Sequence, residues 1–396
     1  MDYDQEYKPI LDVILNQFDK GKIPDHSDED TYIVGRLYDI ITPTLVTARN
    51  MLRRGNINKQ IVVGENMTVP HNSRYISETI RNSIMKNQRR QIIYKYNLDG
   101  RKIIISFGLM KGYERTDLEI DQYFISVCSW LIVCTKYAQN KCGQIQHVNI
   151  YLGGEKKIFP KSTVTTLGPI NVNSGFSDIC SHTNEIVVYR GEEWFKVFIH
   201  ECFHSFGLEP SEINERRLSE YVKQILPIKP RVRVNEAYVE CWARILNSAY
   251  ASIYISSNRD DYLSLVRFSL LLESRFSIAQ ASRVLSFMNL TYHNILNKGD
   301  ITAKTLYKED TNVFAYYVIT AALMFNPYRF LRWCSKNNTQ WLRFNNNPAV
   351  VDRFEQLIHE TMFDANFIGV NDSFSILPGK SVGLRMTIVE SNNSKN

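Results

Sequence analysis

Two histidines and a glutamate stand close together in His200–Glu201–Cys202–Phe203–His204, which has the form H-E-x-x-H. Residues four apart on a helix lie one above the other on the same face, so both imidazoles can reach one metal ion. Glu201 is rotated by roughly 100° from His200, within reach of a water on that ion. Two imidazoles, a third ligand and an open position form a catalytic zinc site, in which a carboxylate takes the proton of the attacking water.

The surroundings of this motif make a chance match less plausible. A random H-E-x-x-H is expected in on the order of one per cent of chains with this composition. The segment Gly191–Phe206 is densely apolar, and two histidines and a glutamate are costly there unless they are paired or bound to a metal. The alternative, two core histidines that are satisfied by backbone carbonyls, stays open from the sequence alone.

A third ligand is expected from the next long helix, which opens with N-E-x-x-x-E. Glu236 and Glu240 are four residues apart and therefore share one face of an otherwise apolar helix. One carboxylate can bind the metal while the other accepts a hydrogen bond from a ligand imidazole and fixes its tautomer. Without the histidine motif, the same glutamates would be read as a solvated stripe.

H-E-x-x-H followed downstream by N-E-x-x-x-E resembles the gluzincin metallopeptidases, over about residues 170–250. The resemblance implies one Zn²⁺ ion held by His200, His204 and Glu236. It also implies Glu201 as general base and Glu240 as the acid that orients a ligand imidazole. The segment NSGFS…IVVYRGEEWFKVFIHECFHSFGL is similar to predicted metallopeptidases of large DNA viruses.

The chain also departs from that family. Thirty-one residues separate His204 from Glu236, more than is usual in gluzincins, which keeps Glu215 and Glu220 open as alternative ligands. The metzincin extension H-E-x-x-H-x-x-G-x-x-H fails, because Pro210 occupies the position of its third ligand. No exopeptidase segment of the aminopeptidase type is visible, which weakens an aminopeptidase assignment.

A peptidase also needs a strand edge that holds the substrate backbone and a donor for the developing oxyanion. Asn173–Ser177 or Glu185–Tyr189, just before the motif, are the candidate edges. The resemblance implies a tyrosine or histidine donor from a later helix. His293 and the pair Tyr316–Tyr317, of which Tyr317 is taken as the catalytic candidate, are the donors considered.

The periodicity of the chain predicts the elements that position these residues. Gly191–Phe206 is expected to be a buried helix, with Glu192 and Glu193 in its first turn and Gly207 as its C-cap. Asn235–Ile255 is expected to be a second helix. Upstream, two β-rich runs flank Asp99–Gly100, a strong hairpin signal.

These elements indicate an α+β fold with a zincin-like catalytic core. We expect an N-terminal α/β region at 1–150, the catalytic core at 151–256, a helical C-terminal region at 257–385 and a flexible tail at 386–396. The apolar runs Phe124–Cys134 and Val313–Phe325 are too short to span a bilayer and are expected to be core helices.

Composition bounds the class of protein. With 396 residues, 44% of them hydrophobic, the chain can bury a large core, which excludes a disordered protein. A net charge of +6 from 47 basic and 41 acidic residues is too small to indicate a dedicated nucleic-acid binder. No export signal is visible, so the seven cysteines are expected to be reduced thiols and the location cytoplasmic, or virion-associated if the chain is viral.

The function expected from the sequence is therefore a zinc metallopeptidase that acts on a peptide or protein substrate. Two alternatives stay open: a zinc hydrolase of a non-peptide amide, and an interaction or virion-structural protein that keeps the scaffold without useful turnover. No nucleic-acid or membrane partner is expected. The choice between endopeptidase and exopeptidase, and the oligomeric state, are left open by the sequence.

Overall fold

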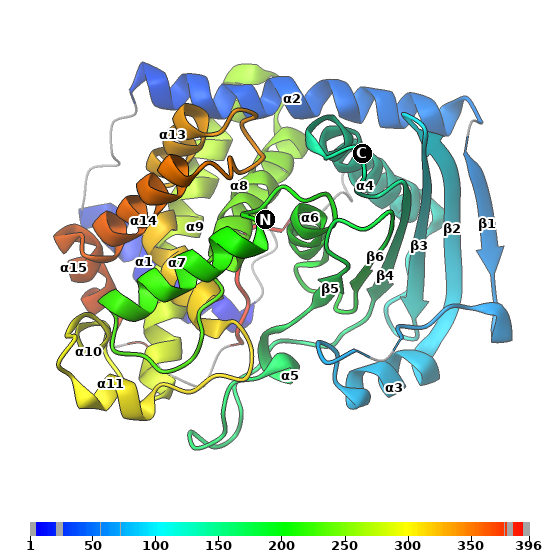
Figure 1. Ribbon diagram of the computed structural model, residues 1–396. Helices are drawn as coiled ribbons and strands as arrows, with labels where there is room; N and C mark the ends of the chain where they lie inside the picture. Colours follow the sequence, from blue (N-terminus) through cyan, green and yellow to red (C-terminus); the bar gives the residue numbers. More distant parts are fainter. Residues whose placement is uncertain are drawn as a thin grey trace.

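The computed structural model describes residues 5–20, 27–55, 57–71, 73–375, 377 and 383–390. It places a mixed β-sheet beside a larger group of helices, which confirms the α+β class (Figure 1). The sheet has the strand order β1-β2-β3-β4-β6-β5. Its strands are β1 (Asn58–Val62), β2 (Gln88–Leu98), β3 (Arg101–Met110), β4 (Ile145–Leu152), β5 (Gly175–Ser177) and β6 (Thr183–Val188).

The strands β3, β4 and β6 run parallel, and the other neighbouring pairs run antiparallel. The hairpin expected at Asp99–Gly100 is confirmed, because Leu98 pairs with Arg101 and both turn residues have positive φ, as such a tight turn requires. β4 lies between β3 and β6, so the sheet crosses the domain boundary that was expected at residue 150. Parallel pairing joins strands that are far apart in the chain, so residues on both sides of position 150 share one sheet.

Helices cover the sheet and extend beyond it. The helices up to the one that carries the motif are α1 (Lys8–Lys20), α2 (Asp28–Arg53), α3 (Glu78–Asn87), α4 (Asp117–Tyr137), α5 (Pro169–Val172) and α6 (Trp194–Ser205). Those that follow are α7 (Glu212–Ile225), α8 (Val234–Ile255), α9 (Arg259–Phe287), α10 (Tyr292–Leu296), α11 (Ile301–Leu306), a π-helical segment (Phe314–Ile319), α12 (Thr320–Met324), α13 (Pro327–Asn337), α14 (Pro348–Met362) and α15 (Ala365–Ser373).

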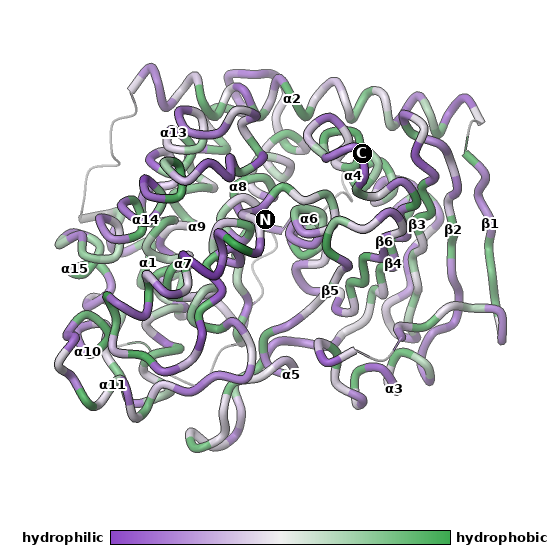
Figure 2. The backbone as a smooth tube through the Cα atoms, in the orientation of Figure 1, coloured by the Kyte–Doolittle hydropathy of each residue, from purple (hydrophilic) through white to green (hydrophobic). Residues whose placement is uncertain are grey.

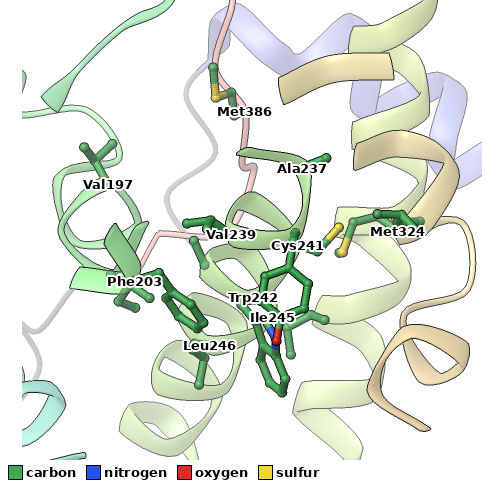
Figure 3. Packing of buried hydrophobic residues seen from close by; sticks show 14 of the residues in the cluster. Val197, Phe203, Ala237, Val239, Cys241, Trp242, Ile245, Leu246, Met324 and Met386 are labelled. Atoms are coloured by element: carbon green, nitrogen blue, oxygen red, sulfur yellow. The ribbon is translucent and has the colours of Figure 1, made fainter. Parts of the chain in front are cut away.

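The helix α6 lies where the sheet meets the helical part of the molecule (Figure 1). It contacts β5 and β6 on one side and α8 on the other, and α4 packs against it as well. The close-up of the buried core shows Phe203 of α6 beside Trp242 and Leu246 of α8 (Figure 3). The histidine motif is thus held by a helix that is packed on several sides.

The helix α4 is the one element within the described residues whose length and composition would suit a membrane span. However, 72% of its most apolar window is buried inside the protein, where it packs against α2 and α6. This is the pattern of a core helix, as expected for Phe124–Cys134. By contrast, α2 runs along the outside of the molecule and mixes hydrophilic and hydrophobic residues (Figure 2).

The start of α6 differs from the expectation. Glu192 and Glu193 were placed in its first turn, but the helix begins at Trp194 and Glu193 precedes it in a left-handed conformation, with φ of 56°. The Glu193 carboxylate makes no capping hydrogen bond with α6 and accepts a hydrogen bond of 2.8 Å from Lys157. Glu193 therefore forms a buried ion pair with Lys157 instead of lying in the first turn of the helix, where its charge was expected to interact with the helix dipole.

The segment 383–390 also differs from the expectation, because 386–390 was assigned to a flexible tail. Its backbone N–H groups at Met386 and Thr387 donate to Glu193 Oε1, at 2.7 and 2.6 Å. Those at Ile388 and Val389 donate to Glu273 Oε1, at 2.8 and 2.7 Å. We call residues 383–390 the C-terminal strap. Residues 391–396, the rest of the expected tail, lie outside the described residues.

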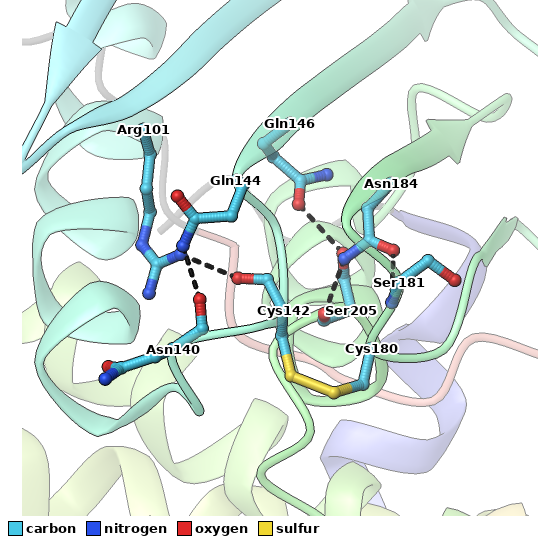
Figure 4. Close-up of a disulfide and its surroundings, with 9 residues drawn as sticks. All are labelled: Arg101, Asn140, Cys142, Gln144, Gln146, Cys180, Ser181, Asn184 and Ser205. Atoms are coloured by element: carbon cyan, nitrogen blue, oxygen red, sulfur yellow. Dashed lines mark hydrogen bonds between the residues drawn. A yellow bond between two sulfur atoms is a disulfide. The ribbon is translucent and has the colours of Figure 1, made fainter.

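The expectation that all seven cysteines are reduced was wrong. Cys142 and Cys180 form a disulfide, and the other five cysteines are buried thiols (Figure 4). The two residues are 38 apart in the chain, but the loops before β4 and before β6 come together because these strands pair. The bond lies next to the end of α6, where the Cys180 N–H donates to His204 O at 3.3 Å.

Candidate metal centre

Two polar stripes face each other across the otherwise apolar contact between α6 and α8. On α6 the stripe consists of residues four apart, namely Lys196, His200 and His204. On α8 it also has this spacing and consists of Glu236, Glu240 and Arg244. Because four residues make slightly more than one helical turn, each stripe stays on one face, and helix packing turns the two faces toward each other.

His200, His204 and Glu236 form a buried group that could hold a metal ion. The Nε2 atoms of the two histidines are 3.1 Å apart. Glu236 Oε2 lies 3.2 Å from His200 Nε2 and 3.4 Å from His204 Nε2. Ligands at 2.0–2.1 Å from a tetrahedral zinc ion are separated by roughly 3.3 Å. The three ligand atoms therefore already have the separations that one such ion requires, and donor type and geometry both fit.

Each ligand has a partner that orients it. His200 Nδ1 lies 3.0 Å from Glu240 Oε2, and this carboxylate is held in turn by Lys196 and Arg244 at 2.9 Å each. His204 Nδ1 lies 2.9 Å from Glu209 Oε1. Such partners leave the Nε2 atoms directed at the position of the ion.

The second carboxylate oxygen of Glu236 accepts a hydrogen bond that helps to orient the side chain, and neighbouring residues determine its protonation state. Asn312 Nδ2 donates to Glu236 Oε1 at 3.2 Å. Burial alone would raise the pKa of Glu236, but His204 and His200 outweigh it and hold the pKa well below its usual range. Burial likewise tends to lower the pKa of both imidazoles, whereas the facing carboxylates raise it. Glu236 is therefore ionised, and its negative charge lies between the two imidazoles, where it could attract a cation.

Glu201 lies beside the three ligands and does not join them. Its Oε2 atom accepts a hydrogen bond of 2.8 Å from Ser177 Oγ at the end of β5. Burial raises the pKa of Glu201, against the opposing effect of His200 and His204. A carboxylate with a raised pKa close to a metal position can accept a proton from a bound water.

The remaining predicted residues fall into two groups. Glu215 pairs with Arg231, and Glu220 lies on the surface near Lys223, so neither alternative ligand joins the described group. His293 on α10 is exposed and binds Asp372, and Figure 1 shows α10 well away from α6. The Tyr317 hydroxyl donates to Leu384 O at 2.6 Å, inside the core. The structure therefore brings neither His293 nor Tyr317 to the site.

The other tyrosine of the pair does reach the site. The rings of Tyr316 and His200 have centroids 5.8 Å apart, and Tyr316 lines the cavity next to the ligands together with Glu201. Successive residues of a helix point in directions about 100° apart, so a pair of tyrosines can place only one side chain here. Burial raises the pKa of Tyr316 far above its usual value, which keeps its hydroxyl protonated.

The strand β5 forms the edge of the sheet beside this cavity. It pairs with β6 on one side and is the last strand in the sheet order. Of the two candidate edges, Asn173–Ser177 therefore contains the edge strand, and Glu185–Tyr189 belongs mainly to the interior strand β6. Gly175, Phe176 and Ser177 line the cavity.

Sequence reasoning missed Glu209 and Asn312. Glu209 follows the Gly207 C-cap, which adopts positive φ as expected, and an acid just after the turn that ends a histidine helix was an available signal. Asn312 comes from a loop more than seventy positions beyond the ligand Glu236, as the printed sequence shows, and no local pattern marks it.

Comparison with known proteins adds little about function. No protein-family model matches the chain, and no solved structure matches it at a significant level. An uncharacterized protein of Acanthamoeba polyphaga mimivirus is 28% identical over 129 residues, which is 32% of each chain. The match thus spans about a third of that relative. This similarity suggests a viral relation and carries no activity with it.

Proposed function

We propose that this protein is a zinc-dependent metallopeptidase of the gluzincin type that hydrolyses peptide or protein substrates. The observation that carries the proposal is the spacing of 3.1–3.4 Å among the three ligand atoms, with a separate carboxylate beside them. Zinc bound there would make a coordinated water acidic and polarise a carbonyl oxygen. We further propose that the protein is viral and is located in the cytoplasm or in the virion.

The residues of the chain divide the remaining tasks. Glu201 accepts the proton of the attacking water, and Ser177 holds its carboxylate in place. The free edge of β5 offers backbone groups to an extended substrate. The protonated Tyr316 hydroxyl supplies a donor for the oxyanion that develops at the carbonyl. This assignment replaces Tyr317 and His293 in that role.

One observation favours a second candidate. The cavity beside the ligands has a volume of only about 60 Å³, which is room for a few water molecules rather than for several peptide residues. A hydrolase of a small non-peptide amide would use the same groups without widening this cavity. Peptide and small-amide substrates therefore both belong in the first activity screen.

The test combines metal analysis with one substitution. Purified protein is expected to contain one zinc per chain, and Glu201→Gln is expected to retain it because Glu201 is not a ligand. Cleavage of a peptide library, followed by mass spectrometry, should fall by roughly 10²–10⁴-fold in Glu201→Gln. If the unmodified protein contains one zinc per chain but cleaves no substrate, the protein is a zinc-binding scaffold and not a hydrolase. Absence of zinc would overturn the proposal as a whole.

A further inference from the structure

A second cavity, of about 220 Å³, lies between α9 and the corner where α12 meets α13. It shares no lining residue with the cavity beside the metal ligands. Its walls combine apolar side chains with two arginines, and those used below are Arg267, Leu270, Leu271, Arg275 and Phe325. It is thus a separate site with a chemistry of its own.

Arg275 is the unusual residue in this cavity. Its Nε and Nη1 atoms are buried and have no hydrogen-bond partner within the described residues. The guanidinium lies over the ring of Phe325, 5.7 Å from its centroid. Burying polar N–H groups without acceptors is costly, and buried donors in folded proteins nearly always have a partner. Two of the guanidinium donors of this cavity-lining arginine are therefore unsatisfied within the described residues.

The neighbouring charges do not supply that acceptor. Asp30 lines the cavity, but its carboxylate pairs with Arg332 and accepts the Ser27 N–H at the start of α2. Burial lowers the pKa of Arg275, and no acidic group offsets this effect. Arginine stays protonated in proteins, so the cavity holds a positive charge that no carboxylate of the described residues pairs with in a salt bridge.

The arginines and the apolar wall come from one face of α9. Arg267, Leu270, Leu271, Ser274 and Arg275 recur at intervals of three and four residues, the spacing of one helix face. Arg267 also has a buried Nε atom without a partner, while its Nη2 donates to Thr31. The face of α9 that lines the cavity therefore has guanidinium groups at its two ends and leucine side chains between them.

We propose that this cavity binds a small organic anion. Its carboxylate or phosphate group pairs with the charged guanidinium of Arg275, beside Arg267, and its apolar body packs against Leu270, Leu271 and Phe325. The planar guanidinium can donate two parallel hydrogen bonds to either kind of head group. The volume suits a single ring with one such group, because pockets for drug-sized ligands are larger.

The test measures binding to the full-length protein by isothermal titration calorimetry. Phenyl phosphate and benzoate are the probes, and benzyl alcohol is the neutral analogue of similar size. We expect saturable binding of at least one anionic probe, and at least tenfold weaker binding of benzyl alcohol. Comparison of the two anions identifies the preferred head group. Equal binding of benzyl alcohol would show a merely apolar pocket and overturn the proposal.

Substitutions assign the binding to this cavity rather than to the metal centre. Arg275→Met should weaken the preferred anion at least tenfold, whereas Arg216→Met, which removes an exposed charge on α7, should leave it unchanged. Arg267→Met provides the same test if Arg275→Met does not fold. Unchanged affinity in the folded arginine variant, or equal loss in Arg216→Met, would contradict the proposal.

Discussion

At the scale of single residues, the three candidate ligands and the carboxylates that orient the imidazoles should contribute differently to zinc affinity. His200, His204 and Glu236 point at one position, and Glu240 and Glu209 only orient the imidazoles. A lost ligand removes a bond to the ion, whereas a lost orienting group allows the ring to turn. The two kinds of substitution should therefore differ in their effect on zinc.

Glu236→Ala is expected to lose zinc on dialysis, because two imidazoles alone hold the ion weakly. Glu240→Gln should retain zinc with an affinity lowered by roughly 10–100-fold, the usual effect of removing such a partner. Glu220→Ala, at an exposed position, serves as the control. Zinc content is measured by mass spectrometry against competing chelators. Full occupancy in Glu236→Ala would move the search for the third ligand to Glu209 or Glu215.

The adjacent tyrosines form a matched pair for the oxyanion donor. Tyr316→Phe should lower kcat by roughly 10²–10³-fold with zinc retained, since it removes a donor beside the ligands. Tyr317→Phe should leave kcat unchanged and cost about 1 kcal/mol of stability through its lost bond to Leu384. Steady-state kinetics and urea unfolding check both. Equal kinetics for the two variants would place the donor elsewhere.

At the scale of elements, the π-helical segment that carries Tyr316 depends on a buried acid. Glu309 Oε2 accepts hydrogen bonds from the Phe314 N–H at 2.6 Å and from the Tyr307 hydroxyl at 2.7 Å. Burial raises the pKa of Glu309 to about 7, although these donors oppose the shift. The folded protein therefore keeps Glu309 protonated at a pH where the unfolded chain has already lost that proton.

This shift predicts how stability changes with pH. The contribution of Glu309 is fully present below its unfolded pKa of about 4.5 and is lost as the pH rises to about 7. The free energy of unfolding should fall over this window by about 3 kcal/mol relative to Glu309→Gln, which cannot titrate. Urea unfolding of both proteins between pH 4.5 and 8 measures the difference. Parallel pH profiles would contradict the assignment.

At the scale of the whole molecule, the C-terminal strap joins parts that are far apart in the sequence. Glu193 precedes α6, pairs with Lys157 and accepts two strap N–H groups. Gly383 at the other end of the strap donates to Glu6, near the N-terminus of the chain. The strap thus connects the segment just before α1 to the start of α6.

Glu193→Gln tests this connection. It removes the salt bridge of the buried Lys157 ammonium, and breaking a buried pair in this way costs about 3–5 kcal/mol. Chemical denaturation should show this loss, while Glu212→Gln on the surface of α7 should change stability by less than about 0.5 kcal/mol. A loss as small as that of the surface variant would mean that the ion pair between Glu193 and Lys157 contributes little to stability.

The sequence by itself determined what local spacing can determine. H-E-x-x-H and the pair Glu236 and Glu240 follow the period of a helix, so each set shares a face wherever the helix packs. The hairpin at Asp99–Gly100 and the C-cap at Gly207 are likewise set by local backbone conformation. For this reason the main elements, the α+β class and a buried group of His200, His204 and Glu236 that could hold a metal ion could be predicted.

Only the tertiary structure decided the contacts between distant segments. It placed Tyr316, rather than Tyr317 or His293, beside the candidate ligands, brought Cys142 to Cys180, and buried much of 386–390, which was expected to belong to a flexible tail. It also added Glu209 and Asn312 to the site. Such contacts depend on how helices and strands pack after they form, and the spacing of residues within one element carries no record of that packing.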